Sequence, residues 1–248
     1  LKRLARGDDR EGAMRILTCP PDHFGVDYVI NPWMEGQIGR VDREKASAQW
    51  EALFEDVARV AHVDVVAARE GSPDMCFTAN AALVLDERAV PARFRNAERR
   101  AEEAPFADWL MADERGLVPL PGNDPFEGEG DALFQPGEAL LWAGYGVRTT
   151  LETHVELAQA FDVEVASLRL VDPRFYHLDT CFTPLPDGRV MYYAPAFDAR
   201  SRREIEARIP EERRLEVGDA DAMGFACNAL RVDDQLFMNH ASEALRAA

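Results

Sequence analysis

The chain has 248 residues, of which 47% are hydrophobic, so it is long enough to bury a large core within one domain. Its 45 acidic and 28 basic residues give a formal net charge of −17, which argues against nucleic acid and anionic lipid as partners. The apolar stretches are no longer than strands, and no charged-then-apolar signal sequence opens the chain, so we expect neither a membrane segment nor a secretory leader.

The four cysteines are widely spaced and form no CxxC motif and no Cys/His cluster; they are Cys19, Cys76, Cys181 and Cys227. This spacing argues against a zinc site and against a disulfide framework, and it favours the reducing cytoplasm. Each cysteine lies in an apolar run, where a buried, unreactive thiol is the usual reading. We expect no metal site.

The two ends of the chain differ from its middle. Residues 1–13 are charged and contain glycine without a core pattern, so we expect a leader outside the fold. The first convincing strand is predicted over residues 14–18, and a well-patterned helix over 43–61. At the other end, a helical pattern begins at Ala241 and stops at Ala248 after its first turns. The prediction is one domain over 14–248 that is truncated at its C-terminus.

Four segments along the chain share one order of elements, a strand, a turn, a second strand and a helix. The strand pairs are predicted over 77–90, 130–142, 178–193 and 225–238, turning at 86–88, 135–137, 186–188 and 233–234. Helices are predicted over 97–112, 151–161, 198–208 and from 241 onward, and further short strands over 118–120, 163–170 and 214–217. The Pro-Asp-Gly at 186–188 is a strong hairpin signal. The repeating unit is therefore ββαβ, and the N-terminal strand and helix supply part of a fifth unit.

Each repeat opens with a polar residue on its first strand. These residues, Asn80, Asp131, Asp179 and Asn228, recur at intervals of roughly 50 residues. If the repeats surround an axis, the leading strands meet at the centre and the polar side chains line one shared site. The alternative is that each Asn or Asp merely satisfies a strand end.

His177 and Asp179 are two residues apart on a predicted strand, which would point both side chains to the same face. A histidine exchanges protons near neutral pH, and a carboxylate beside it can bind a cation. By itself this pair is weak evidence for a catalytic site, because a structural, hydrogen-bonded histidine is the commoner explanation.

The motifs around this pair make a specific set in their order and spacing, although no single one is decisive. They are 19–24 (CPPDHF), 28–34 (YVINPWM), 73–80 (PDMCFTAN), 94–99 (FRNAER), 126–133 (FEGEGDAL) and 175–180 (FYHLDT). Together they resemble the guanidino-group-modifying enzyme superfamily, which includes arginine deiminase, dimethylarginine dimethylaminohydrolase and glycine amidinotransferase. Within it, the chain is most similar to the arginine dihydrolase domain of cyanobacteria and other bacteria. The resemblance covers essentially everything from Met14 onward.

The resemblance implies an α/β fold, a five-bladed α/β-propeller of ββαβ units, with the last blade incomplete in this chain. It also implies cofactor-free chemistry on a guanidino group. A cysteine thiolate attacks the guanidinium carbon, and a histidine protonates the departing ammonia and then activates water. The resemblance places that cysteine in the last blade, after a Gly-Gly-x-x-x-Cys turn beyond Ala248. Cys181 and Cys227 match positions that are not nucleophiles in the superfamily.

The resemblance also assigns the catalytic roles. His177 matches the general acid and base, Asp179 the acidic partner beside it, and Glu127 the acidic residue ahead of the Gly-Asp pair. The chain reads E-G-E-G-D where deiminases read E-G-G-D, so Glu127 and Asp131 both stay open as the carboxylate that approaches the substrate. A solvated turn is the alternative reading of Glu127.

Further positions match residues that bind the substrate. Arg99 and Arg148 match the pair that holds the α-carboxylate, a task that suits the guanidinium fork. Phe77 matches a phenylalanine of the superfamily, and Asn80 stands where arginine deiminases have an aspartate. Asn31 is characteristic of the dihydrolase branch and is expected to face the site. The alternatives are a surface ion pair for Arg99 and a core position for Phe77.

Two classes of function stay open. The first class is an enzyme, and its leading member is an arginine dihydrolase that yields ornithine, ammonia and carbon dioxide. The alternatives within this class are a deiminase or a dimethylarginine hydrolase, which give citrulline, and an amidinotransferase. The amide of Asn80 favours the dihydrolase, because it can accommodate both a guanidinium and a neutral ureido group. The second class is a catalytically dead arginine-binding module. In both, the partner is a small guanidino compound; assembly into a homo-oligomer stays open.

Overall fold

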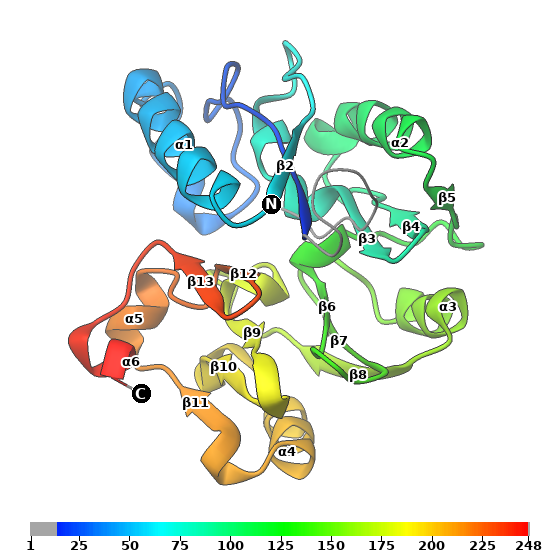
Figure 1. The fold of residues 1–248 in the computed structure, drawn as a ribbon, viewed down its shortest axis with the longest axis vertical. Helices are drawn as coiled ribbons and strands as arrows, with labels where there is room; N and C mark the ends of the chain where they lie inside the picture. The colour runs from blue at the N-terminus through cyan, green and yellow to red at the C-terminus, as the bar shows by residue number, and fades with distance from the viewer. Residues whose placement is uncertain (1–13, 248) are drawn as a thin grey trace. The chain divides into compact units, whose positions relative to one another are not determined.

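The computed structural model describes residues 14–247, which fall into two compact units that meet in sequence at Pro119 and Leu120. The predicted leader, residues 1–13, lies outside the described residues. Both units consist of small sheets and helices that alternate along the chain (Figure 1).

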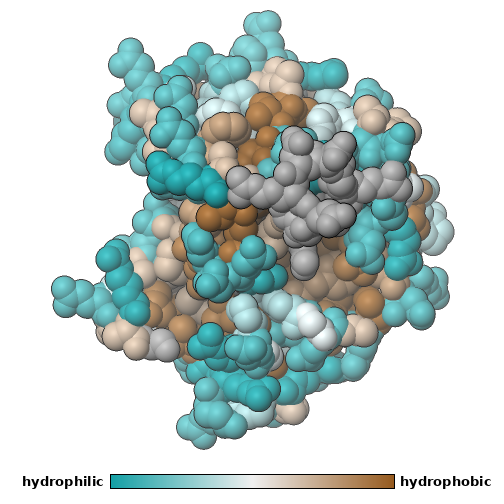
Figure 2. Space-filling model, viewed as in Figure 1, coloured by the Kyte–Doolittle hydropathy of each residue, from teal (hydrophilic) through white to brown (hydrophobic). Residues whose placement is uncertain are grey.

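The first sheet of the first unit is formed by β1 (Arg15–Thr18) and β2 (His62–Val65), which pair in parallel. The helix α1 (Arg43–Ala58) connects them, and the indole nitrogen of Trp50 in this helix donates to Thr18 Oγ1 at 2.9 Å. Only Val57 of α1 is buried, and Figure 2 accordingly shows hydrophilic side chains over this helix. The strand and helix predicted here are confirmed, whereas β2 was not predicted.

The second sheet of the first unit has the order β3-β4-β5. The hairpin of β3 (Ala82–Leu85) and β4 (Arg88–Pro91) is antiparallel, and β5 (Gly116–Leu117) runs parallel to β4. The predicted helix over 97–112 is divided into the 3-10 helix η4 (Ala97–Glu102) and the α-helix α2 (Glu103–Ala112). The short strand predicted over 118–120 lies instead at Gly116–Leu117, just before the predicted range.

The second unit repeats this order twice. Its first sheet is β6-β7-β8, with β6 (Ala132–Phe134) antiparallel and β8 (Glu164–Arg169) parallel to β7 (Leu140–Tyr145). The helix α3 (Glu152–Phe161) joins β7 to β8 and lies alongside that sheet (Figure 1).

The next sheet has the same order, with β10 (Val190–Tyr192) between β9 (Phe182–Pro184) and β11 (Arg214–Glu216). Here α4 (Ala199–Arg208) is the connecting helix, which Asp198 caps by accepting from Ser201 N at 2.7 Å. The predicted ββαβ repeat is therefore confirmed in three sheets.

A further hairpin pairs β12 (Ala229–Val232) with β13 (Gln235–Met238) and is followed by α6 (Glu243–Ala247). The short helix α5 (Asp219–Met223), which precedes it, was not predicted. Short 3-10 helices fill the connections: η1 (Pro32–Met34), η2 (Pro73–Cys76), η3 (Thr78–Ala81), η5 (Gly128–Gly130), η6 (Leu178–Thr180), η7 (Pro186–Gly188), η8 (Ala194–Ala196) and η9 (Glu211–Arg213). No helix among residues 14–247 is both long enough and apolar enough to span a membrane.

Three of the four polar residues expected on leading strands lie instead on or beside the 3-10 turns that precede those strands, and the fourth, Asn228, directly precedes β12. Asn80 lies in η3 and Asp179 in η6, while Asp131 directly follows η5. The prediction that His177 and Asp179 share one face of a strand is therefore wrong. Buried apolar residues on both sides of the turn, such as Leu178, resemble a strand in sequence, but Leu178 N donates to the Asp131 side chain at 3.0 Å instead of to a neighbouring strand.

The backbone hydrogen bonds that open each hairpin define the true equivalence between repeats. The carbonyls of Ala81, Asp131 and Cys181 accept from Ala92, Gly144 and Tyr193, respectively. These three acceptors are 50 residues apart, as are Phe77, Glu127 and His177, the residues that directly precede η3, η5 and η6. Asn80, Asp131 and Asp179 thus occupy three different places in the repeat.

The apolar core of the second unit lies between its two three-stranded sheets. The Trp142 and Phe182 rings pack with centroids 5.0 Å apart, and both residues are fully buried. The buried indole N–H of Trp142 donates to Gln135 Oε1 at 2.9 Å, and Gln135 Nε2 donates to Leu185 O at 3.0 Å. One amide side chain thus joins the two sheets while satisfying a buried donor.

His154 in α3 is a buried histidine with a structural environment. Its Nε2 is 3.3 Å from Gly144 O and its Nδ1 is 2.7 Å from Ser167 Oγ. A carbonyl only accepts, so Nε2 carries the proton and Nδ1 accepts from the serine hydroxyl. Burial lowers the pKa of His154 from 6.5 to about 4.

We expect the stability of the chain to fall as the pH drops from 6.5 toward 4, because in that window the unfolded chain binds a proton at His154 that the folded chain excludes. Thermal unfolding followed by calorimetry between about pH 7 and about pH 5 measures this slope. His154→Gln should reduce it, whereas the same change at the exposed His23 should not. Equal slopes in wild type and His154→Gln would contradict the assignment.

Candidate functional site

One buried carboxylate oxygen in the second unit binds a histidine and an arginine together. Glu127 Oε2 lies 2.7 Å from His177 Nε2 and 3.0 Å from Arg148 Nη1. The exposed fractions of these side chains are 0%, 4% and 3%. A carboxylate accepts only, so the N–H of a neutral His177 ring is on Nε2, which makes Nδ1 the basic nitrogen.

The repeat explains how residues far apart in sequence meet here. Glu127 and His177 occupy equivalent backbone positions, each directly before a 3-10 helix. Arg148 lies after β7, in the loop that leads to α3. Its guanidinium carbon is 4.9 Å from the centroid of the Tyr176 ring, which in turn lies 5.0 Å from the His177 ring. The cation–π contact fixes the arginine beside the histidine.

Asp131 holds the backbone around this cluster through hydrogen bonds that both of its carboxylate oxygens accept. Its Oδ1 accepts from Leu178 N at 3.0 Å, and its Oδ2 accepts from Thr149 Oγ1 at 2.7 Å. The same Thr149 oxygen accepts from Glu127 N at 3.1 Å. Of the two carboxylates that the sequence left open, Glu127 therefore contacts the histidine, and Asp131 holds the backbone around it. Burial raises the pKa of Asp131 to about 6.

Asp179 lies in η6, two residues after His177, and its backbone carbonyl oxygen accepts from Asn228 Nδ2 at 3.4 Å. Burial raises the pKa of the Asp179 carboxyl to about 7.

A second buried polar cluster lies in the first unit around Arg99. Glu102 binds it with two bonds, Oε1 accepting from Nε at 3.1 Å and Oε2 from Nη2 at 2.8 Å. Arg99 Nη1 donates to Asn80 Oδ1 at 2.7 Å, and Nη2 also donates to Asp74 O at 3.2 Å. The Asp74 carboxylate accepts from Tyr28 OH at 2.8 Å. The predicted substrate-binding residues Asn80 and Arg99 are thus in direct contact.

Phe77 is an exposed ring, whereas Asn31 is a helix-capping residue. Phe77 occupies the position equivalent to Glu127 and His177 and is 46% exposed, so the core reading of this residue is wrong. Its ring meets Phe24 edge to face at 5.7 Å. Asn31 caps η1, with its side-chain oxygen accepting from Trp33 N at 3.0 Å, which is a local structural task.

The other two alternatives also fail. Glu127 is fully buried, so it is not a solvated turn residue, and the ion pair that Arg99 makes is buried instead of superficial. Sequence reasoning missed Glu102, Tyr176 and Thr149 as parts of these clusters. The spacing of Glu102 three residues after Arg99 was the one available signal, since such pairs share a helix face.

All four cysteines have thiols that resist ionisation. Burial raises the pKa of Cys19 to about 12 and raises those of Cys76, Cys181 and Cys227 as well. A nucleophilic cysteine needs the opposite shift. Cys181 and Cys227 are also 0% and 1% exposed, so burial disfavours a nucleophilic role for either thiol. Among the described residues, no group of three or more His, Cys, Asp and Glu side chains is placed to hold a metal ion.

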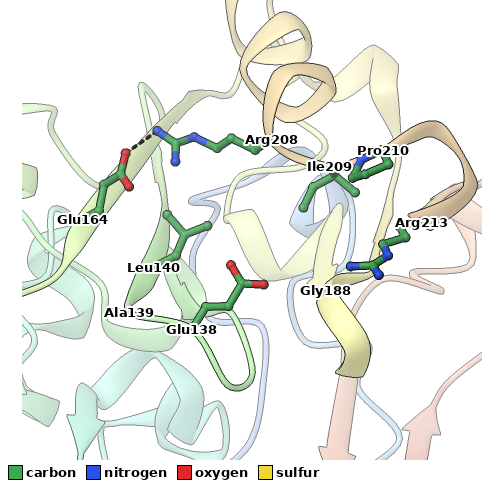
Figure 3. A pocket seen from close by; sticks show the side chains of 9 residues that line it. All are labelled: Glu138, Ala139, Leu140, Glu164, Gly188, Arg208, Ile209, Pro210 and Arg213. Atoms are coloured by element: carbon green, nitrogen blue, oxygen red, sulfur yellow. Dashed lines mark hydrogen bonds and ion pairs between the residues drawn. The ribbon is translucent and has the colours of Figure 1, made fainter.

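A surface cavity of about 320 Å³ lies elsewhere in the second unit (Figure 3). Its walls are Glu138, Ala139, Leu140, Glu164, Gly188, Arg208, Ile209, Pro210 and Arg213. Arg208 in this wall is bound to Glu164 at 2.6 Å. The cavity shares no residue with the Glu127–His177–Arg148 cluster.

Comparison with known proteins gives the family. No protein-family model matches the chain. It is 52% identical over 233 residues to the bifunctional arginine dihydrolase/ornithine cyclodeaminase of Synechocystis sp.. The matched region covers 94% of this chain and 33% of that protein. It is 42% identical over 217 residues to N(G),N(G)-dimethylarginine dimethylaminohydrolase of Mycobacterium tuberculosis, covering 87% of this chain and 70% of that protein. The chain thus spans about a third of the Synechocystis protein.

Comparison with solved structures points to the same family. One of them is the N-terminal domain of ArgZ, a cyanobacterial arginine dihydrolase, in a cysteine-to-serine mutant bound to substrate. It matches with a TM-score of 0.92 and 52% identity, and the match covers 94% of this chain and 86% of that one. A dimethylarginine dimethylaminohydrolase adduct matches with a TM-score of 0.77 at 17% identity, which shows the fold alone. These matches confirm the predicted fold class. The chain belongs to the guanidino-group-modifying enzyme superfamily, with the arginine dihydrolases and dimethylarginine dimethylaminohydrolases.

Proposed function

We propose that this chain carries the substrate-binding and acid–base part of an arginine dihydrolase, which converts arginine to ornithine, ammonia and carbon dioxide through a cysteine-linked intermediate. The observation that carries the proposal is the buried Glu127–His177–Arg148 cluster. The high identity to an arginine dihydrolase over 94% of this chain supports it.

The proposed acid–base work falls to His177. With Nε2–H bound to Glu127 at 2.7 Å, Nδ1 exchanges protons with the departing ammonia and with the attacking water. When Nδ1 is protonated the ring is a cation, and the adjacent Glu127 carboxylate stabilises it. Glu127 also fixes the tautomer, so its role is to position and charge-stabilise the histidine.

Recognition of the amino-acid end falls to Arg148. A substrate α-carboxylate is the natural partner of a guanidinium, and the Tyr176 ring holds this guanidinium in place. The proposed ligand is therefore an α-amino acid with a guanidino group. The covalent step needs a thiolate, which none of Cys19, Cys76, Cys181 and Cys227 supplies.

A second candidate is an arginine-binding module without chemistry. The buried pair of His177 and Glu127 favours the enzyme, because a histidine held by a carboxylate is the arrangement that acid–base catalysis uses. Product analysis of the full-length protein that carries this chain, incubated with arginine, separates the two. Release of ammonia and ornithine supports the dihydrolase, and intact arginine supports the binding module.

Arg148→Lys should weaken arginine binding about tenfold or more, because an ammonium cannot replace the bidentate fork on a carboxylate. Agmatine, which lacks the carboxylate, should bind wild type and variant about equally. Calorimetric titration of the 248-residue chain measures both ligands, with the exposed Arg202→Lys as control. An equal loss for both ligands would show that Arg148 does not read the carboxylate.

His177→Asn should lower kcat of the full-length protein by roughly 100- to 10,000-fold, the usual contribution of one acid–base group. Glu127→Gln should lower kcat and also displace the pH–rate profile, because the amide no longer stabilises the imidazolium. Steady-state kinetics across pH tests both variants. Full activity in either one contradicts the assignment.

Asn80→Asp should move the product from ornithine toward citrulline. An aspartate carboxylate accepts only, so it favours the guanidinium over the neutral ureido group of the second stage. Chromatographic separation of the two amino acids after complete reaction measures the ratio. An unchanged ornithine yield counts against the role given to Asn80.

A further inference from the structure

The peptide group that follows His177 is held at both ends. Its carbonyl oxygen accepts from Thr180 Oγ1 at 2.6 Å, and its N–H, which belongs to Leu178, donates to Asp131 Oδ1 at 3.0 Å. Asp131 and Thr180 are 1% and 4% exposed, so water does not compete freely for either bond. Because a peptide group is planar, two bonds at its opposite ends fix the backbone from which the His177 side chain projects.

The backbone of Glu127 is held by the same aspartate through one intermediate. Glu127 N donates to Thr149 Oγ1 at 3.1 Å, and the Thr149 hydroxyl donates to Asp131 Oδ2 at 2.7 Å. A hydroxyl has one proton and two lone pairs, so it makes both bonds at once. The two oxygens of the Asp131 carboxylate therefore reach the backbones of both Glu127 and His177, and all of these residues lie in the second unit.

The fold itself does not require a carboxylate at the position of Asp131. Ala81 and Cys181 occupy this position in their own repeats, since their carbonyls accept the equivalent backbone bond. Both are buried, one with a methyl group and the other with a thiol. A buried carboxylate is costly unless donors surround it. Of the three equivalent positions, the one that bears this cost is the one whose side chain reaches the turn after His177.

The packing around Gly144 shows how closely this contact is built. Gly144 N donates to the Asp131 carbonyl at 2.8 Å, which brings the glycine against the contact between Asp131 and Leu178. A Cβ at this position would stand 2.9 Å from Leu178 Cβ and 3.3 Å from Asp131 Oδ1. Because the interior is close-packed, any larger residue at position 144 would displace the turn after His177.

We propose that Asp131 and Thr149 are positioning residues, which hold the backbones of Glu127 and His177 so that the two side chains meet at hydrogen-bonding distance. This inference rests on the proposed function. The two residues act through His177, whose Nδ1 has to stand at a defined place to exchange protons with the departing ammonia and the attacking water. Loss of the Thr149 hydroxyl should therefore slow catalysis more than it weakens substrate binding.

The test compares Thr149→Val with Thr149→Ser, because valine has the shape of threonine without its hydroxyl and serine keeps the hydroxyl. Steady-state kinetics of the full-length protein with arginine measures both variants. Thr149→Val should lower kcat about 10- to 100-fold and change KM less than about twofold, as expected when a catalytic group is misplaced by about 1 Å. Thr149→Ser should recover most of the lost rate. Cys181→Ala, a buried change at the position equivalent to Asp131, should leave kcat unchanged even where it lowers the Tm.

Gly144→Ala is a further variant, and it keeps the inference testable if Thr149→Val does not fold. It retains Asp131 and Thr149 but displaces the turn after His177, so the same selective loss of kcat is expected. A wild-type kcat in the folded variants, or equal losses in the valine and serine variants, overturns the positioning role and leaves the proposed function standing. A rise in KM with kcat unchanged also overturns it, because it would assign Thr149 to substrate binding. A wild-type protein that leaves arginine intact overturns the proposed function together with this inference.

Discussion

The carboxylate of Glu127 is the constraint on which the second unit depends. It is fully buried, and an ionised group in such a place costs several kcal/mol unless donors surround it. His177 and Arg148 supply them at one oxygen, and Thr149 and Asp131 hold the turns from which these side chains project. The burial of Glu127 therefore depends on these partners.

The first unit also buries a glutamate against an arginine, but the further side chain that the pair contacts is a different one. Each unit buries one arginine–glutamate pair, Arg99 with Glu102 and Arg148 with Glu127. In each, one member of the pair reaches a further side chain, the Asn80 amide in one case and the His177 ring in the other. The charges cancel within each pair, and what remains is a neutral group held in a defined orientation.

Sequence patterns were sufficient for the repeat but not for the turns. Alternating apolar residues and signals such as Pro-Asp-Gly located the hairpins and the helices that follow them, because those features are local. The 3-10 turns were taken for strands, since buried residues such as Leu178 hide the change of backbone geometry. The spacing drew attention to His177, but its role, and Glu127 itself, came only from the resemblance. Their contact joins residues 50 positions apart, which no local pattern reveals. Glu102 was not singled out, because its burial depends on tertiary packing.

The equivalence of positions 77, 127 and 177 has a consequence for how such proteins diversify. One backbone site, repeated three times, carries an aromatic ring, an acid and a base. Because the repeat builds the main chain before each 3-10 turn, three dissimilar side chains stand on the same local backbone. Each of them then depends on its own partners, as Glu127 does on His177 and Arg148. A duplicated module thus becomes a means of presenting dissimilar functional groups from one backbone geometry.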